Sequence, residues 1–380
     1  MVPLSRPHIT EAEVTAVTEV LRSGWLTHGP KTTEFEKRVA SYLGVRHAVA
    51  MNSATSALYL ALVAQDIRGE VILPSFTFVA TANAVVTAGA MPVFAEVEPD
   101  TGNLDPDDVL RRITPATEAI MVVHYAGHPA RMDRIMAIAQ KHHLAVVEDS
   151  AETLGGEWQH RKAGSFATGV FSFFPTKNIT CGEGGMLTTG DDALAYRVRA
   201  LVAHGLTTTT AQREHSTRPW YRSAHVPGYN FRLSNLLAAI GVEQMRKLDL
   251  LNGARRRHAR YFNEKLTPFE NLLTPVELPG AKHVYQMYTV RVRGVSRDAF
   301  VLALREKGIG ASVHFDPPVH LHECYRESHR RTHLPVTEHL ASTIVTLPMF
   351  PSLTHAEREE TVDAVKDVLA TLPRTEKQCA

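Results

Sequence analysis

The sequence predicts an α/β protein with a large, mostly parallel sheet domain and a smaller C-terminal α+β domain. Short apolar segments typical of buried strands alternate with amphipathic helical segments through the first half of the chain. A length of 380 residues exceeds what one small core needs and suits a large domain plus a smaller one. We expect the large domain to span residues 1–250 and the small domain residues 251–380, with the boundary inside a long helix.

The first half of the chain supplies the elements of the expected sheet. A helix follows Thr10, whose side chain can cap it, and a second helix is expected at 35–43. Because strands separated by crossover helices pair in parallel, the alternation that follows predicts a mostly parallel sheet. The expected strands are 47–51, 70–74, 92–97, 117–123, 145–149 and 186–189, and the crossover helices are 105–113, 131–142 and 191–204.

The second half of the chain has a different pattern. Residues 205–228 are polar and are expected to form a long mobile loop. A helical pattern then runs from 234 to about 266, and the three arginines at 255–257 are expected to be exposed. Strands at 288–292 and 312–315, with a helix at 297–307 between them, predict the small α+β domain.

Charge and composition indicate which kinds of binding partner and which cellular compartment the chain is suited to. With 41 basic and 40 acidic residues the net charge is +1. The chain therefore has no excess of positive charge that would attract nucleic acid or an acidic membrane surface. The three cysteines are widely spaced and suggest neither disulfides nor zinc, so a reducing cytoplasm is expected. The first ten residues lack the apolar core of a signal peptide, no apolar segment approaches the length of a membrane span, and no metal site is expected.

A single lysine lies in a glycine-rich turn after an apolar segment. Lys177 follows the mostly apolar residues 170–174 and precedes glycines at 182, 184 and 185. A half-buried lysine loses hydration as a cation, which favours the free amine that covalent catalysis needs. Ser172 could present its hydroxyl to a phosphate, and the glycines allow a backbone approach that a side chain would block. A solvated surface lysine is the ordinary alternative.

Two further patterns place polar groups at strand ends. Asp149 ends a strand at the carboxyl edge of the expected parallel sheet, where ligands of open α/β sheets bind. An aspartate there is also a common helix cap. Residues 52–58 form a turn of small residues between a strand and a helix, an arrangement that aims backbone N–H groups at an anion. Any helix N-cap has a similar sequence, so both interpretations stay open.

Together these motifs resemble a known family. Glu-Asp-Ser-Ala-Glu at 148–152, Ser-Phe-Phe-Pro-Thr-Lys-Asn at 172–178 and Gly-Glu-Gly-Gly at 182–185 resemble the nucleotide-sugar aminotransferases of the DegT/DnrJ/EryC1/StrS group. These enzymes depend on pyridoxal 5′-phosphate (PLP), and the resemblance runs almost end to end. It implies fold type I of the PLP-dependent transferases, which is aspartate aminotransferase-like, with residues 1–250 as the PLP-binding domain.

The resemblance implies how the cofactor would be held. Lys177 would carry PLP as a Schiff base, and Asp149 would face the pyridine nitrogen and keep it protonated. Ala54 and Thr55 match the phosphate-binding positions of the family. Phe78 matches the position of a ring stacked on the pyridine, although a core phenylalanine would look the same.

Two further positions follow from the same resemblance. Asn230 matches an asparagine that reaches the PLP phosphate of the neighbouring subunit, which would make the active site exist only in a homodimer. Glu152 lies where the family commonly has Gln or His near the 3-oxygen of the cofactor. A carboxylate there would repel a phenolate unless it were protonated or turned toward another donor.

The resemblance also implies the reaction. An amino group would pass from L-glutamate, which leaves as 2-oxoglutarate, to a nucleotide-linked keto sugar, with pyridoxamine 5′-phosphate (PMP) as the intermediate form of the cofactor. Residues 123–127 and 177–181 also match the branch that acts on UDP-linked 4-keto sugars, such as the enzyme making UDP-4-amino-4-deoxy-L-arabinose. A GDP- or dTDP-linked sugar aminated at C4 or C3 stays open.

Two other functions are compatible with the same fold. Sugar dehydratases of this fold replace the lysine by histidine, whereas this chain retains Lys177. A non-catalytic or regulatory protein is the second alternative, because fold alone does not determine activity. The presence of Thr55, Asp149 and Lys177 together argues against it.

Overall fold

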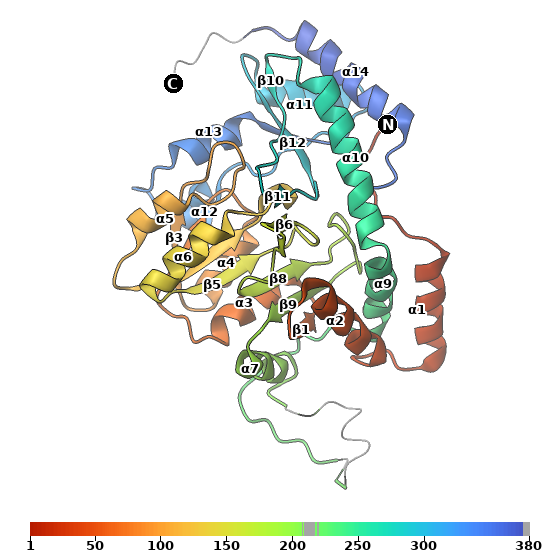
Figure 1. The fold of residues 1–380 in the computed structure, drawn as a ribbon, viewed down its shortest axis with the longest axis vertical. Helices are drawn as coiled ribbons and strands as arrows, with labels where there is room; N and C mark the ends of the chain where they lie inside the picture. The colour runs from red at the N-terminus through yellow and green to blue at the C-terminus, as the bar shows by residue number, and fades with distance from the viewer. Residues whose placement is uncertain (207, 209–216, 219, 375–380) are drawn as a thin grey trace.

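A seven-stranded sheet forms the centre of the computed structural model, which describes residues 1–206, 208, 217, 218 and 220–374 (Figure 1). The strand order is β1-β9-β8-β5-β4-β2-β3. Neighbouring strands pair in parallel, except that β9 runs antiparallel to both β1 and β8. The expected mostly parallel sheet is therefore confirmed. Its strands are β1 (His47–Met51), β2 (Glu70–Pro74), β3 (Met91–Ala95), β4 (Thr117–Val123), β5 (Ala145–Asp149), β8 (Thr168–Ser172) and β9 (Gly185–Thr189).

Both faces of this sheet are buried, which explains the continuous apolar strands. In β4, Met121 belongs to one core cluster, while its neighbours Ile120 and Val122 belong to another. Successive strand residues point to opposite faces, so a strand covered on both sides is apolar throughout. One face is covered by α3 (Ala54–Val63), α4 (Ala80–Thr87) and α7 (Asp192–Val202), and the other by α2 (Pro30–Leu43), α5 (Pro106–Arg112) and α6 (Met132–His142).

The C-terminal part forms a second core around a small antiparallel sheet. Phe262, Tyr288, Phe300 and Phe350 are fully buried in it. Val2 joins this core, and its N–H donates to the carbonyl of Gly308, so the N-terminus packs against the C-terminal part. The boundary at residue 250 stays a prediction. The elements are β10 (Leu272–Leu273), β12 (Tyr288–Val292), β13 (Ile344–Leu347), α11 (Arg297–Glu306), α12 (Glu323–Arg326), α13 (Pro335–Thr343) and α14 (His355–Thr371).

Helices connect the two cores along one side of the molecule (Figure 1). The helix expected at 234–266 is two helices, α9 (Asn235–Arg246) and α10 (Leu248–Leu266), because Lys247 leaves helical geometry with φ −117° and ψ 9°. The N-terminal helix α1 (Glu11–Ser23) packs against α9. Smaller elements are β6 (Glu157–Trp158), β7 (Arg161–Lys162), β11 (Ala281–Lys282), η1 (Tyr125–Gly127) and η2 (Val319–Leu321).

The structure differs from the sequence-based expectation at Arg255 and at residues 312–315. Arg255 is buried rather than exposed, because its face of α10 packs between the two cores. The strand expected at 312–315 is only an isolated bridge between Ser312 and Thr346. The loop expected at 205–228 falls partly on positions outside the described residues.

Candidate active site

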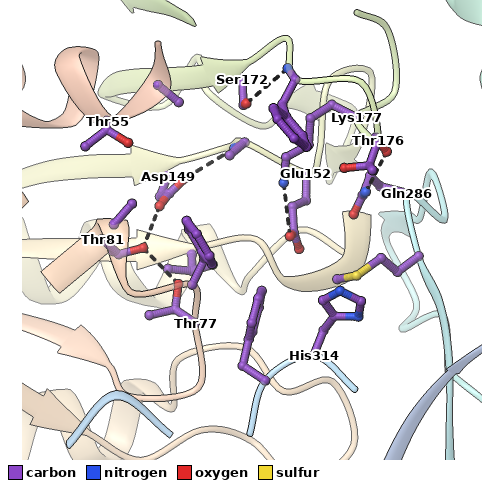
Figure 2. Close-up of a pocket in the computed structure, with 18 of the residues that line it drawn as sticks. Thr55, Thr77, Thr81, Asp149, Glu152, Ser172, Thr176, Lys177, Gln286 and His314 are labelled. Atoms are coloured by element: carbon purple, nitrogen blue, oxygen red, sulfur yellow. Dashed lines mark hydrogen bonds and ion pairs between the residues drawn. The ribbon is translucent and has the colours of Figure 1, made fainter. Parts of the chain in front are cut away.

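A cavity of about 410 Å³ opens at the carboxyl edge of the parallel strands, between the two cores (Figure 2). The large sheet and its following turns form one wall. Gln286, His314 and Thr346 from the C-terminal part form the other. Seven of the eight site residues expected from the sequence line this cavity: Ala54, Thr55, Phe78, Asp149, Glu152, Ser172 and Lys177.

Lys177 lies in a turn that directly follows β8. Its backbone N–H donates to the carbonyl of Phe174, which closes the turn, and its side chain is 17% exposed. Gln286 donates its side-chain N–H to the carbonyl of Thr176 at 2.9 Å (Figure 2). The amine is therefore held inside the cavity wall by a turn that is fixed from both sides, so Lys177 is not a solvated surface lysine.

Glu152 is the group that holds the amine of Lys177. One carboxylate oxygen lies 3.3 Å from Lys177 Nζ, and the other accepts the backbone N–H of Ala126 at 2.8 Å. Ala126 has a left-handed backbone with φ +55°, which turns its N–H inward. Glu152 is thus turned toward other donors, which is one of the two arrangements that would avoid repulsion of a phenolate.

Asp149 ends β5 beneath the cavity. Its carboxylate accepts the hydroxyl of Thr81 at 2.8 Å and the backbone N–H of Ala151 at 3.3 Å. The hydroxyl oxygens of Thr77 and Thr81 lie 2.8 Å apart. Because the hydroxyl of Thr81 donates its only proton to Asp149, the hydroxyl of Thr77 is the donor in this second bond. Burial raises the pKa of the Asp149 carboxyl. No helix starts at this aspartate, so the helix-cap interpretation does not apply.

The N-terminus of α3 forms the second polar corner of the cavity. Ser53 caps the helix by accepting the N–H of Ser56, which leaves the first-turn N–H groups of Ala54 and Thr55 directed at the cavity. Ser172 faces the same corner (Figure 2). A Cβ on Gly185 would come within about 2.4 Å of Ala54 N, so this glycine allows β9 to lie against the helix start.

Phe78 supplies an apolar surface in the cavity. Its ring is 60% exposed although it belongs to the wall, so it is not a core phenylalanine. The ring of Phe315 lies 6.1 Å away, from the C-terminal part. An open aromatic face of this kind suits stacking on a flat heteroaromatic ring.

Asn230 is the one expected site residue that does not line the cavity. It is exposed, and its side-chain oxygen accepts Arg232 Nε at 3.1 Å. The expected role of Asn230 is toward a neighbouring subunit, and a single chain leaves that role a prediction.

Several polar residues of the wall were not among the expected site residues: Ser5, Thr77, Thr81, Gln286, His314 and Thr346. His314 Nδ1 lies 2.8 Å from the hydroxyl of Thr346, and burial lowers the pKa of the imidazole. Thr77 and Thr81 lie beside Phe78 in the sequence, so their proximity to an expected site residue was the available signal. Gln286 and His314 do not belong to any motif that can be recognised from one sequence alone.

The residues present fit the expected cofactor. An aldehyde can reach the amine of Lys177, and free helix N–H groups with the Ser172 hydroxyl suit a phosphate. The buried Asp149 carboxylate accepts only hydroxyl and amide donors, and a protonated ring nitrogen would supply the cation that it lacks. Across the described residues there is no group of three or more His, Cys, Asp or Glu side chains arranged to hold a metal. Nor does any helix in those ranges have the length and apolarity to cross a membrane.

Comparison with known proteins identifies the family. The model of the DegT/DnrJ/EryC1/StrS aminotransferase family matches residues 7–366. The chain is 38% identical over 377 residues to the spore coat polysaccharide biosynthesis protein SpsC of Bacillus subtilis, and the match covers 97% of each protein.

Solved structures share the whole fold. The sugar aminotransferase CalS13 from Micromonospora echinospora has a TM-score of 0.88 at 30% identity, covering 97% of this chain and 100% of that one. The PMP form of Spr1654 from Streptococcus pneumoniae has a TM-score of 0.91 at 28% identity, covering 97% and 99%. The expected aminotransferase fold is confirmed. The chain belongs to the DegT/DnrJ/EryC1/StrS aminotransferase family and is a PLP-dependent sugar aminotransferase.

Proposed function

We propose that the protein transfers the amino group of L-glutamate to a UDP-linked 4-keto sugar, with PLP and PMP as the two forms of its cofactor. One observation carries the proposal. Lys177, Asp149, Phe78 and the start of α3 share one wall of a single cavity, so an amine, a carboxylate, an aromatic face and an anion site converge.

Each of these groups has a separate task in holding the cofactor. When bound, PLP would supply an electron sink next to the nitrogen that is transferred. Asp149 would hold the ring nitrogen, Phe78 would support one ring face, and the amides of Ala54 and Thr55 with Ser172 would bind the phosphate. Thr81 and Thr77 keep the Asp149 carboxylate oriented.

Lys177 is the group that moves protons. Its Nζ removes the proton from the α-carbon of the amino donor, and in the second half-reaction it delivers a proton to the sugar carbon that receives the amino group. Glu152 Oε1, at 3.3 Å, stabilises Lys177 while its amine carries the extra proton. Because the amine and both reacting carbons share one enclosed site, a single lysine serves both halves.

The substrate assignment rests on resemblance. Residues 123–127 and 177–181 match the branch that acts on UDP-linked 4-keto sugars. In the structure these two segments contribute Val123 and Lys177 to the same cavity. L-Glutamate is proposed as the donor on the same ground.

A homodimer is proposed because the site of one chain lacks cations for a nucleotide diphosphate. Among the described residues, the cavity wall contains Lys177 and His314 but no arginine. Asn230 and Arg232 lie outside it, and Trp220 and Tyr221, in the segment of the chain that precedes Asn230, are exposed by 74% and 55%. Exposed aromatic side chains of this size are typical of an interface, which would bring Asn230 to a neighbouring cavity.

The substrate is tested with the PMP form of the enzyme. The protein is incubated with UDP-, GDP- and dTDP-linked keto sugars, and the return of the PLP absorbance is followed for each. We expect the UDP-linked 4-keto sugar to restore the spectrum fastest. Faster recovery of the absorbance with a GDP- or dTDP-linked sugar, or with a 3-keto sugar, would contradict the proposed substrate and identify that sugar as the substrate instead.

The shared site is tested by mixing two inactive variants. Lys177→Ala lacks the amine, and Asn230→Ala lacks the proposed contact with the neighbouring subunit. If Asn230 serves the partner, a mixed dimer contains one site with both groups intact, and mixing restores activity. A mixture that stays as inactive as its components would contradict the shared site.

A further inference from the structure

Three consecutive backbone carbonyls around Lys177 are bound by side chains from the C-terminal third of the chain. The carbonyl of Thr176 accepts from Gln286 at 2.9 Å. The next two, of Lys177 and Asn178, accept from the guanidinium of Arg255 at 3.2 and 3.0 Å. No regular secondary structure satisfies these carbonyls, so the conformation of the lysine turn depends on the two side chains.

Arg255 is unusual because it is a buried cation without a counter-ion. It is 4% exposed, and no carboxylate of the described residues lies within ion-pair distance of it. Its Nε has no hydrogen-bond acceptor, and burial lowers the pKa of its guanidinium to about 9. Burying an unpaired charge is costly, so an apolar side chain of similar size would be the stable choice if packing were its only task.

Asn252, one helical turn before Arg255 in α10, also binds the segment around Lys177. Its side-chain oxygen accepts the side-chain N–H of Asn178 at 2.8 Å, and its own N–H donates to the carbonyl of Leu154 at 2.8 Å. Leu154 lies two residues after Glu152, the partner of Lys177 Nζ. One face of α10 therefore contacts both the lysine turn and the segment that carries Glu152.

The position of Arg255 in α10 connects these contacts with both cores. The start of the helix, at Leu248 and Leu251, packs in the core cluster that contains Ile179. Its later part, at Ala259 and Phe262, packs in the core of the C-terminal part. Arg255 lies between these two stretches, so the packing of both cores fixes where its guanidinium lies.

We propose that Arg255 is a positioning residue that holds the turn 176–178 so that Lys177 Nζ is presented to the aldehyde of PLP. The proposal rests on the proposed function, because it assumes that Lys177 bonds to the cofactor. The rate of bond formation is sensitive to small displacements of the reacting atoms. A fixed turn keeps the amine close to the position from which it attacks the aldehyde, whereas a mobile turn would place it there only part of the time. The other cofactor contacts do not involve Arg255, so bonding and binding should respond differently to its loss.

Apoenzyme variants separate these two quantities. PMP has no aldehyde, so its affinity reports the cofactor site without the lysine bond, whereas the visible absorbance of added PLP reports bond formation. For Arg255→Met we expect PMP affinity within about twofold of wild type, and bond formation slowed by about tenfold or more. Arg255→Lys keeps the charge but lacks the rigid guanidinium fork whose two nitrogens each bind one carbonyl, so its rate should lie in between.

The matched control is Arg257→Met on the exposed side of the same helix, which should behave as wild type in both measurements. Equal losses of PMP affinity and of bond formation in Arg255→Met would indicate a general loosening of the site and overturn the proposal. Unchanged bond formation would overturn it as well. If Arg255→Met does not fold, the same comparison is made with Arg255→Lys. A wild-type apoenzyme that forms no bond with PLP would refute the proposed function before any variant is tested.

Discussion

Glu152 has two bonds of different kinds, and they can be separated by substitution. Its contact with the N–H of Ala126 needs only an oxygen, whereas its contact with Lys177 uses the negative charge. A glutamine at this position would keep the first kind of bond only. The side chain therefore has one task that is structural and one that stabilises the charged amine.

Glu152→Gln should retain activity within about tenfold of wild type, because the amide oxygen can still accept the Ala126 N–H. Glu152→Ala leaves that N–H buried without an acceptor, which costs about 1–3 kcal/mol and should lower kcat by about a hundredfold. Steady-state kinetics of both variants measures the difference. Equal activity of the two variants would show that the Ala126 contact is unimportant.

Asp149 is expected to act through its charge. Asp149→Asn keeps the shape and can still accept from Thr81, but it cannot hold a protonated ring nitrogen. We expect kcat to fall by about a hundredfold or more while the protein stays folded. Thr81→Val removes one hydrogen-bond donor to Asp149 and leaves the charge, so kcat should fall less than in Asp149→Asn. A fully active Asn variant would exclude the proposed role of this carboxylate.

The sequence could reveal the residues that lie within contiguous motifs. Lys177 and Asp149 stand in short segments with a chemical pattern, and the structure places both in the cavity. Gln286 and His314 come from the other core and meet Lys177 only through the tertiary fold. The burial of Arg255 was missed for the same reason, because an arginine in a helix is usually solvated and only packing between two cores reverses this.

At the scale of elements, the long and strongly apolar strands were the predictable ones. Strands β1, β2, β4 and β5 begin and end at the expected residues, since each is buried on both faces. The two-residue strands β6, β7, β10 and β11 have too few residues to show a period. The break at Lys247 between α9 and α10 was also missed, because no glycine or proline marks it.

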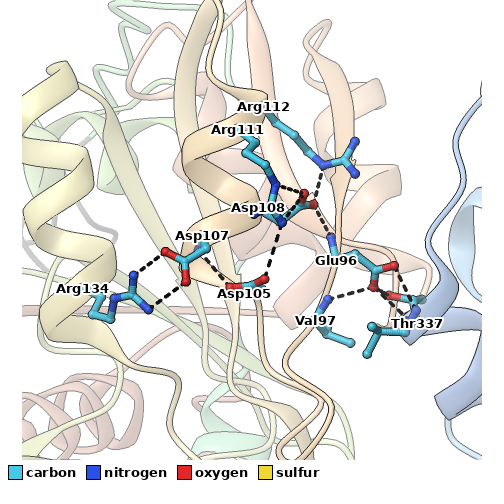
Figure 3. A network of polar contacts seen from close by, with 10 residues as sticks. Glu96, Val97, Asp105, Asp107, Asp108, Arg111, Arg112, Arg134 and Thr337 are labelled. Atoms are coloured by element: carbon cyan, nitrogen blue, oxygen red, sulfur yellow. Dashed lines mark hydrogen bonds and ion pairs between the residues drawn. The ribbon is translucent and has the colours of Figure 1, made fainter.

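Helix α13 is attached to the large sheet by one carboxylate. Glu96 follows β3, is 9% exposed, and accepts the backbone N–H groups of Val336 and Thr337 at 3.1 and 3.0 Å (Figure 3). Its own N–H donates to Asp108, which also binds Arg112. The network fixes the start of a C-terminal helix to the edge of the large sheet.

Glu96→Ala should lower the free energy of unfolding by about 2 kcal/mol, because two N–H groups at a helix start lose their acceptor. Glu96→Gln should cost less, since an amide oxygen can still accept. Asp107→Ala, which removes an exposed ion pair with Arg134 in the same region, is the control and should leave stability near that of wild type. Denaturant unfolding gives the three values. A Glu96→Ala protein as stable as the control would contradict the attachment.

For the whole molecule, buried neutral histidines predict a loss of stability in acid. Burial lowers the pKa of His128 to about 4, and it also lowers the pKa values of His283, His258 and His314. Between pH 6.5 and pH 4 the unfolded chain binds protons that the folded protein does not bind. The free energy of unfolding therefore falls as the pH falls through this range.

His128 alone should contribute up to about 3 kcal/mol of this loss, since one pKa unit corresponds to about 1.4 kcal/mol. The ring is 2% exposed, and its Nε2 accepts the N–H of Leu278, which requires the neutral form. His128→Gln does not titrate, so its unfolding free energy should depend less steeply on pH than that of wild type. Parallel pH profiles of the two proteins would show that His128 does not contribute.

The two cores and the cavity between them are a property of the whole chain. Alternation of strands and helices predicted the large sheet, but the wall built from Gln286, His314 and Thr346 follows only from the packing of the second core. The N-terminal residues Leu4 and Ser5 also reach this cavity, although no local pattern of residues indicates it. Contacts between distant segments have no local pattern, and the structure is needed to find them.

Reduction of the holoenzyme with borohydride tests the central claim, a covalent bond between Lys177 and the cofactor. Reduction makes this bond permanent, and peptide mass analysis then locates it. We expect the mass of the cofactor on the peptide that contains Lys177, and no such adduct in Lys177→Ala. An adduct on another lysine, or none from a yellow protein, would contradict the account.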